Sequence, residues 1–138
     1  MSAKDRIHDA VKNALIKDGW DIIADPYPIQ YKEIRLLADL AGEKGIAATK
    51  EEQKVVIEVK SFVGRSPMRE FQTALGQYLI YRTFIEQMHA DYQIYLAVNQ
   101  DIYDQFFQQI AIQLILKTYQ VLLLIIDLST EEVRRWIN

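Results

Sequence analysis

Residues 54–62 read Lys-Val-Val-Ile-Glu-Val-Lys-Ser-Phe, and the rest of the chain is organised around this β-branched run. Side chains alternate between the two faces of a strand, so one face of the run is purely apolar while the other carries Val56, Glu58 and Lys60. Burying a charged side chain costs free energy unless it is paired or binds an ion. The run therefore predicts a core strand whose polar end carries chemistry, with a surface ion pair at a sheet edge as the plainer alternative.

Composition narrows the class of protein. The chain has 138 residues, 50% hydrophobic side chains and no cysteine, which predicts one domain over residues 1–138, no disulfide and no thiolate metal site. The net charge of −3 argues against a broad basic surface for nucleic acid. The longest apolar run, Val121–Ile126, is far shorter than the roughly 20 residues of a membrane span. We expect a cytoplasmic protein without membrane contact.

The N-terminal segment predicts a helix. Apolar residues recur at helical spacing from Lys4 to Lys17, and Gly19 ends the pattern. His8 lies on the flank of the apolar stripe, about 90° from its centre at 100° per residue. Taken alone, His8 is interpreted as a half-buried polar residue.

Further strand candidates precede the central run. Trp20–Ala24 is short and ends at a proline-rich turn, whereas Tyr27–Tyr31 and Ile34–Ala41 predict a hairpin. Asp39 is an acid inside an otherwise apolar strand, and aspartate is a poor strand former. The polar segment Gly42–Gln53 is interpreted as a connection with room for a helical turn.

Helices and strands alternate after the central run. Ser66 and Pro67 predict the cap and first position of a long helix that reaches Gln87. Later segments predict, in order, a strand, a helix, a strand and a tail: Tyr92–Val98, Ile102–Tyr119 (with Phe106, Ile110 and Leu114 in register), Val121–Leu128 and Glu131–Asn138. The core order αβββαβαβ indicates an α/β (α+β) fold, a mixed sheet flanked by helices.

Two acids and one amine converge if the strands that carry them pair. Neighbouring strands lie about 5 Å apart, close enough for Asp39 and Glu58 to share a cation. Two carboxylates, a backbone carbonyl such as that of Val59, and water are ligands that Mg²⁺ or Mn²⁺ prefers. Such an ion lowers the pKa of bound water, while Lys60 orients that water or neutralises developing charge.

The acid-x-Lys triplet is weak evidence when taken alone. A second copy, Glu52-x-Lys54, lies in the polar connection, and about one copy is expected by chance in a chain of this length. The weight of the prediction therefore rests on the position of Glu58 and Lys60 at the end of an apolar strand, after Asp39.

The pattern resembles the PD-(D/E)xK nuclease superfamily: Asp39, then Glu58-Val59-Lys60, then a helix containing Gln77. This resemblance implies a restriction-endonuclease-like fold and a magnesium-dependent, endonuclease-like activity on DNA, with Gln77 beside the metal site. The usual proline before the aspartate is Ala38 here.

Two further positions extend this resemblance. Gln77 and Tyr81 have the Gln-x-x-x-Tyr spacing of the RecB-like branch and share a helical face, with core packing as the alternative for Tyr81. In archaeal Holliday junction resolvases of the superfamily, an acid lies eleven residues before the glycine that closes the first helix, and the same count from Gly19 reaches His8. The resemblance therefore implies that His8 lies near the site, although the family has an acid there.

A narrower resemblance covers nearly the whole chain. Separated segments are similar to the cyanobacterial XisH family, factors associated with excision of the fdxN element: residues 8–15, 57–64, 74–78 and 95–98. This resemblance implies a protein that controls a programmed DNA rearrangement carried out by a separate site-specific recombinase, with an XisI-like companion protein.

Two functional hypotheses follow. In the first, the protein is a metal-dependent nuclease; in the second, it is a noncatalytic regulator that binds DNA or a partner. The three charged positions favour the first, and the acidic balance favours the second. Arg65 and Arg69 are candidates for phosphate contact near a helix start, with solvated surface charge as the alternative. The apolar helix Met68–Gln87 permits a homodimer.

Overall fold

A computed structural model of the chain describes residues 2–46, 51–89 and 91–138. Four helices lie in these ranges: α1 (Ala3–Lys17), α2 (Pro67–Met88), α3 (Gln100–Gln105) and α4 (Ile110–Thr118). Eight strands accompany them: β1 (Asp21–Ala24), β2 (Tyr27–Tyr31), β3 (Ile34–Ala38), β4 (Leu40–Ile46), β5 (Glu51–Val59), β6 (Tyr92–Asn99), β7 (Leu123–Asp127) and β8 (Glu132–Ile137).

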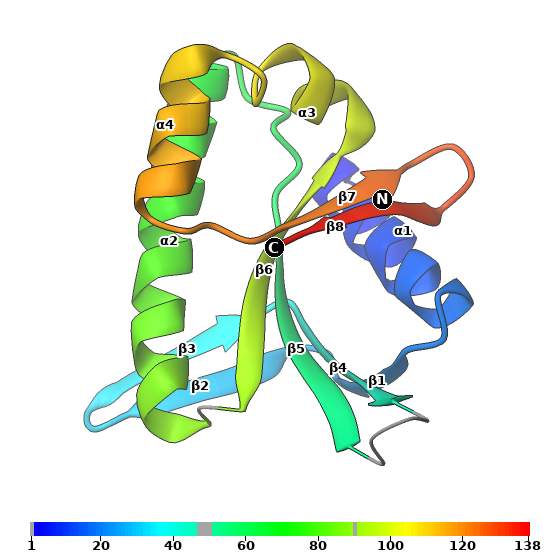
Figure 1. Cartoon of the computed structure of the whole chain (residues 1–138), viewed down its shortest axis with the longest axis vertical. Coiled ribbons are helices and arrows are strands. Elements are labelled where there is room, and N and C mark those ends of the chain that lie inside the picture. The colour runs from blue at the N-terminus through cyan, green and yellow to red at the C-terminus, as the bar shows by residue number, and fades with distance from the viewer. Residues whose placement is uncertain (1, 47–50, 90) are drawn as a thin grey trace.

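Six strands form one mixed sheet in the order β1-β4-β5-β6-β7-β8, while β2 and β3 form a separate hairpin (Figure 1). The three middle strands β5, β6 and β7 are parallel, and the pairs β1-β4, β4-β5 and β7-β8 are antiparallel. The predicted α/β class, a mixed sheet flanked by helices, is confirmed. The central run occupies β5, an interior strand with one antiparallel and one parallel neighbour.

Helix α1 and the group of α2, α3 and α4 lie on different sides of the sheet (Figure 1), and the sheet separates two hydrophobic layers. On one face, α1 covers the buried side chains of Val55 and Ile57, and the rings of Trp20 and Trp136 lie 5.2 Å apart. On the other face, α2, α3 and α4 cover a second layer that includes Val56. The alternation predicted from the central run is therefore confirmed, because neighbouring β5 side chains enter opposite layers.

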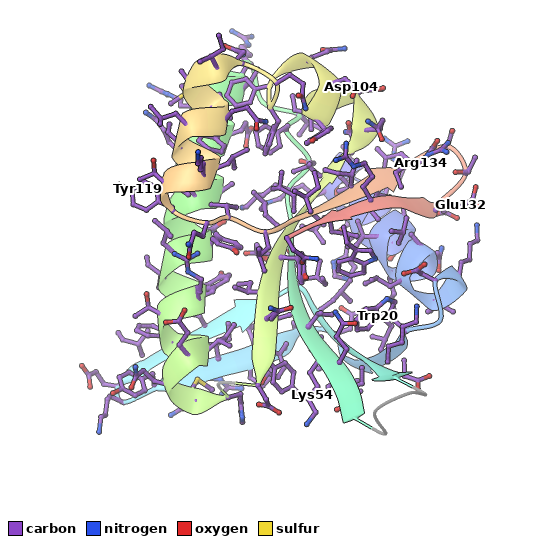
Figure 2. All side chains as sticks on the ribbon, in the orientation of Figure 1. Trp20, Lys54, Asp104, Tyr119, Glu132 and Arg134 are labelled. Atoms are coloured by element: carbon purple, nitrogen blue, oxygen red, sulfur yellow. The ribbon has the colours of Figure 1, made fainter. Side chains whose placement is uncertain are left out.

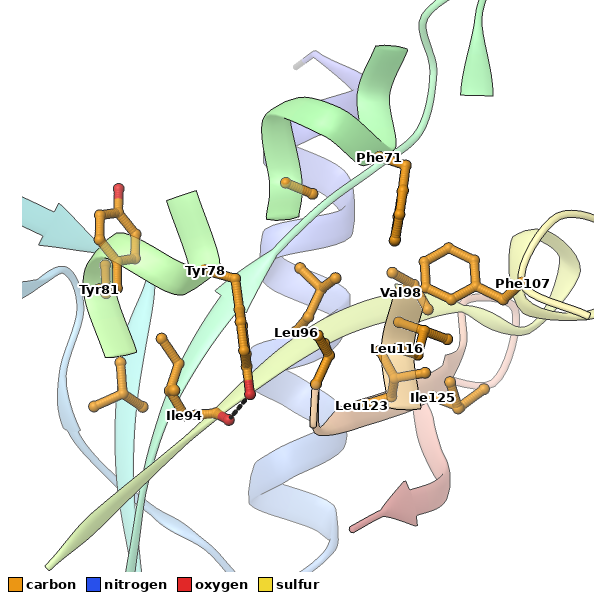
Figure 3. Close-up of a cluster of buried hydrophobic side chains, with 14 of the residues drawn as sticks. Phe71, Tyr78, Tyr81, Ile94, Leu96, Val98, Phe107, Leu116, Leu123 and Ile125 are labelled. Atoms are coloured by element: carbon orange, nitrogen blue, oxygen red, sulfur yellow. Dashed lines mark hydrogen bonds between the residues drawn. The ribbon is translucent and has the colours of Figure 1, made fainter. Parts of the chain in front are cut away.

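A buried tyrosine joins α2 to the sheet. The hydroxyl of Tyr78 donates a hydrogen bond to the carbonyl oxygen of Ile94 over 3.0 Å (Figure 3) and accepts one from the backbone N–H of Leu122 over 3.0 Å. The Tyr78 side chain is fully buried. It therefore satisfies two backbone groups at the place where α2 packs on β6.

Helix α1 ends and helix α2 begins at the residues that the sequence predicts. The hydroxyl of Ser66 accepts a hydrogen bond from the backbone N–H of Arg69 over 3.2 Å, and Pro67 occupies the first turn of α2. Helix α1 ends at Lys17, and Gly19 then adopts a φ of +94°, a left-handed conformation that glycine accepts without strain. Both helices are confirmed within one or two residues.

Two predictions around Asp39 need correction. The predicted strand Ile34–Ala41 is divided at Asp39, because β3 pairs with β2 in the hairpin whereas β4 pairs with β1 and β5. The segment Gly42–Gln53 is not a helical connection, since it supplies most of β4 and the first part of β5; its residues 47–50 lie outside the described residues. Backbone pairing on both edges of β4 overrides its polar composition.

The predicted helix Ile102–Tyr119 is also wrong. The chain breaks between α3 and α4, where Phe106 and Phe107 both enter the core. The predicted register fails because Ile110 is 90% exposed. The core instead receives other α4 side chains, Ile112 and Leu116.

The predicted tail Glu131–Asn138 is instead strand β8. It pairs with β7, and Trp136 lies opposite Leu124. Arg134, which follows Glu132 on β8 (both labelled in Figure 2), donates hydrogen bonds to the Asp127 carboxylate. None of the helices in the described ranges combines the length and the apolar character needed to cross a membrane.

Candidate active site

Asp39 and Glu58 meet at the end of β5. Asp39 occupies the break between β3 and β4, and its Oδ2 accepts a hydrogen bond from the backbone N–H of Val59 over 2.7 Å. The β4-β5 register places Leu40 opposite Ile57, so Asp39 lies beside Glu58. Glu58 is only 4% exposed. The structure therefore brings together the two acids that the sequence places on separate strands.

The carboxyl of Asp39 perturbs that of Glu58. Burial raises the pKa of Glu58, and the hydrogen bond and charge of Asp39 raise it further, to about 9. The positive charge of Lys60 lowers the pKa of Glu58 but does not compensate. At neutral pH, Glu58 therefore retains its proton unless another cation approaches. A buried carboxyl with a pKa shifted in this way is typical of functional sites.

Lys60 lies directly beyond β5. Its backbone N–H donates a hydrogen bond to the carbonyl oxygen of Ala97 over 3.0 Å, which extends the pairing with β6. Within the described part of the chain, no carboxylate forms an ion pair with the Lys60 ammonium. The burial of Glu58 and this free ammonium both weigh against a surface ion pair at a sheet edge.

Helix α2 carries Tyr81, which lies near the acids, and Gln77. The hydroxyl of Tyr81 donates a hydrogen bond to the carbonyl oxygen of Leu37 over 3.4 Å. Burial raises the pKa of Tyr81 to about 12, with the charges of Glu58 and Asp39 acting in the same direction. One turn earlier, Gln77 Oε1 is buried and has no hydrogen-bond partner among the described residues. A buried acceptor of this kind is suited to a bound water or ligand donor.

His8 approaches the acids from α1. Its Nε2 lies 2.9 Å from Oδ1 of Asp25, and its Nδ1 lies 3.9 Å from Oδ1 of Asp39. Lys12 donates a hydrogen bond to the other oxygen of Asp25 over 2.7 Å. Sequence reasoning identified His8 but missed Asp25, which it assigned to the proline-rich turn. The available signal was the spacing of His8 and Lys12, which puts both on one helical face.

Two arginines near the start of α2, Arg65 and Arg69, are exposed. A hollow of about 630 Å³ lies along α1, and Ser61 and Val63, which follow Lys60, form part of its wall. Neither Asp39 nor Glu58 lines this hollow. Contact between either arginine and a phosphate stays a prediction.

The donor set suits a hard divalent cation. Mg²⁺ usually takes one or two carboxylates and keeps several waters, and Asp39 and Glu58 supply two adjacent carboxyls. The buried oxygen of Gln77 lacks a partner in the described ranges. No group of three or more histidine, aspartate or glutamate side chains surrounds one point within those ranges. The residues therefore fit an ion held largely by two carboxylates, backbone oxygen and water.

Known proteins are similar to this chain in sequence and fold. The sequence profile of the family described as XisH protein matches residues 1–134. The crystal structure of an XisH family protein from Nostoc punctiforme has 38% identity and a TM-score of 0.90, over 97% of this chain and 100% of that chain. That of a fdxN element excision controlling factor protein from Anabaena variabilis has 38% identity and a TM-score of 0.89, over 97% of this chain and 99% of that chain. A comparison with curated proteins finds no significant match. The family match and both structural matches span nearly the whole chain, which therefore belongs to the XisH family.

Proposed function

We propose that this protein controls excision of a DNA element and does so as a metal-dependent phosphodiesterase of the PD-(D/E)xK type. The name of the Anabaena relative supports the first part, since that protein is a fdxN element excision controlling factor. The carboxyl pair of Asp39 and Glu58 supports the second part. Two adjacent acids, Asp39 at the break between β3 and β4 and the buried Glu58 on β5 with a pKa of about 9, form a site that a bound cation would stabilise.

Asp39 and Glu58 would hold Mg²⁺ or Mn²⁺, with the carbonyl oxygen of Val59 as a further ligand. When bound, such an ion supplies a water of lowered pKa and offsets negative charge on a phosphodiester. The chain's own polar groups orient the reactants around it. Asp39 is fixed for this role because the Val59 N–H holds one of its oxygens.

Lys60 and Gln77 would position the attacking water and the phosphate. The Lys60 ammonium is free of carboxylate partners in the described ranges, so it can face charge that develops on phosphate oxygen. Gln77 Oε1 can accept a hydrogen bond from the water, because no described residue occupies it. Hydrolysis forms a bond from water oxygen to phosphorus and breaks a bond from phosphorus to a sugar oxygen, which takes up a proton.

Purified protein tests the catalytic part. Duplex, single-stranded and branched DNA are incubated with Mg²⁺ or Mn²⁺, and cleavage is followed on denaturing gels. Lys60→Met should reduce the cleavage rate at least about 100-fold, since general stabilising groups are commonly worth that much. Lys54→Met is the matched control. Lys54 lies on β5, the strand that leads to Lys60, and pairs with Asp91 over 3.2 Å. It stands at the opposite end of the molecule from Asp104 of α3 (Figure 2). Absence of cleavage by the wild type on every DNA form, or equal loss in both variants, would contradict the catalytic proposal.

A noncatalytic regulator is the second candidate, and the net charge of −3 favours it. An acidic chain lacks the general attraction to DNA that a nuclease commonly uses. In this version the protein binds DNA or partner proteins, namely an XisI-like companion, a site-specific recombinase or a second copy of the chain, and does not use Asp39 or Lys60 to do so. Excision measured in cells separates the candidates: Lys60→Met and Asp39→Asn abolish excision in the catalytic case and leave it intact in the regulatory case.

A further inference from the structure

We propose that the β2-β3 hairpin holds DNA beside the carboxyl pair, through the exposed face that carries Arg35 and Leu37. The proposal rests on the DNA-directed function above and names a binding surface for it, but it does not depend on a metal ion. The hairpin is separate from the six-stranded sheet (Figure 1), and Asp39 follows β3 directly. The hairpin thus ends where the candidate site begins.

The two faces of the hairpin differ in what they contact. On the inner face, Ile29 and Ala38 are fully buried, and the ring of Tyr31 stacks on that of Phe84 of α2 at 5.7 Å. Side chains alternate between the faces of a strand, so the next positions form the outer face. It consists of two opposed pairs, all exposed: Pro28 with Leu37 and Gln30 with Arg35. Because α2 covers the inner face, the outer face remains open to a binding partner.

The hairpin carries positive charge that no carboxylate pairs. Arg35 and Lys32 are exposed, and neither forms an ion pair within the described ranges. Glu33, beside Lys32 at the tip of the hairpin, offsets part of this charge. Several cations elsewhere in the structure are instead paired with carboxylates: Lys12, Lys44, Lys54, Arg82 and Arg134. The hairpin cations are therefore available to the phosphates of DNA.

A second set of unpaired cations approaches the acids from another element. Lys60 follows Glu58 on the way to α2, and Arg65 and Arg69 lie near the start of that helix. Within the described ranges, none of these three cations forms an ion pair. Clustered cations attract a polyanion locally even though the net charge of the chain is −3. The two sets favour DNA over a protein as the partner of the outer face.

Leu37 adds an apolar contact to the outer face. Its carbonyl oxygen accepts the hydrogen bond from the Tyr81 hydroxyl over 3.4 Å, which ties its backbone to α2, but its side chain is 53% exposed. Leu37 precedes Asp39 by two residues, about 7 Å along an extended chain, and Arg35 precedes it by four, about 13 Å. Proteins contact DNA through phosphates and through the apolar parts of base edges. The outer face offers both kinds of contact beside the acids.

Fluorescence anisotropy in the presence of EDTA tests this contact without cleavage. Labelled duplex, single-stranded and branched DNA are titrated with the protein at a series of salt concentrations. Arg35→Gln should weaken binding and reduce the slope of log K against log salt by about 0.9 on duplex DNA, as expected for one lost phosphate contact. Adding Lys32→Gln should double this reduction. Arg135→Gln is the matched control, because Arg135 is exposed on β8, at the far margin of the sheet from β4; it should leave the affinity and the slope unchanged.

Leu37→Ser separates the apolar contact from the charged one. It should weaken DNA binding by up to about 10-fold and leave the salt slope unchanged, because an apolar contact releases no counterions. Leu114→Ser is its control: Leu114 is 64% exposed on α4, and its replacement should not alter binding. Thermal unfolding of each variant checks that these replacements at exposed positions leave the fold intact.

The outcomes separate this proposal from the function on which it rests. If the wild type binds DNA and the Arg35 and Leu37 variants keep its affinity and salt slope, only the hairpin contact is overturned. If the wild type binds no form of DNA even at low salt, the hairpin contact and the DNA-directed function both fail. If the variants lose binding as expected but the wild type cleaves no DNA with Mg²⁺ or Mn²⁺, the hairpin contact stands and the catalytic proposal fails.

Discussion

The Oδ2 atom of Asp39 accepts a hydrogen bond from the backbone N–H of Val59 over 2.7 Å, and this contact holds a second carboxyl beside Glu58. Because the charge of Asp39 raises the pKa of Glu58, Asp39→Asn should lower that pKa from about 9 by at least about one unit. Titration followed by ¹³C NMR of labelled glutamate carboxyls measures the change. Asp91→Asn should leave the Glu58 titration where it is, and an unchanged titration in Asp39→Asn would show that burial alone sets the pKa.

Glu58 should destabilise the metal-free protein as the pH rises. The pKa of this carboxyl is about 9 in the folded state against an ordinary 4.5. Between these values the folded chain binds the extra proton, so the free energy of unfolding falls with pH, by up to about 1.4 kcal/mol per unit. Glu58→Gln has no such proton, and its advantage over the wild type should grow from pH 5 to pH 8.5 in urea unfolding with chelator present. Parallel pH profiles for the two proteins would contradict the shift.

Tyr78→Phe should destabilise the fold without altering the acids. The lost hydroxyl satisfies the Ile94 carbonyl and the Leu122 N–H, and leaving such groups unpaired costs about 1–3 kcal/mol. Chemical denaturation measures the difference. Tyr119→Phe is the control, since Tyr119 is 46% exposed and its replacement should change stability by less than about 0.5 kcal/mol. Equal stabilities for Tyr78→Phe and the wild type would mean that water replaces the hydroxyl.

The break between α3 and α4 predicts an unequal pair of alanine variants. Phe107 is fully buried against Phe71 and Phe62, so Phe107→Ala should cost about 3–5 kcal/mol. Ile110 is 90% exposed, and Ile110→Ala should stay within about 0.5 kcal/mol. Thermal unfolding of both variants checks the contrast. A large loss from Ile110→Ala would indicate that α4 packs in the register of one continuous helix.

The local sequence predicts a helix or strand correctly where its separate signals agree with one another. Helices α1 and α2 have apolar stripes and capping residues, and β5 has an uninterrupted β-branched run. The signals of α4 mislead, because Ile110 is as apolar as a core residue and only tertiary packing leaves it exposed. Strand β8 is also invisible locally, since its polar side chains reveal nothing of the long-range pairing with β7 that holds it in place.

The residues of the site also fall into those that the sequence reveals and those that it does not. Asp39 and Glu58 stand out in the sequence because acids interrupt apolar strands, and the β4-β5 register then brings them together. Asp25 does not stand out, because an aspartate before a proline is ordinary turn chemistry. Its meeting with His8 depends on the angle at which α1 crosses the sheet, and no spacing along the chain encodes that angle.

Strand β8 also decides which edge of the sheet meets solvent. Without β8, the edge strand of the sheet would be β7, which lies in the uncharged run Val121–Ile126. Exposed apolar segments of this kind pair with identical segments of other chains and form fibrils. With it, the margin carries Glu132, Arg134 and Arg135, and an incoming strand would have to lie along this row of charges. The residues of β8 thus hinder self-aggregation, and a truncation that removed them would first reduce the solubility of the protein.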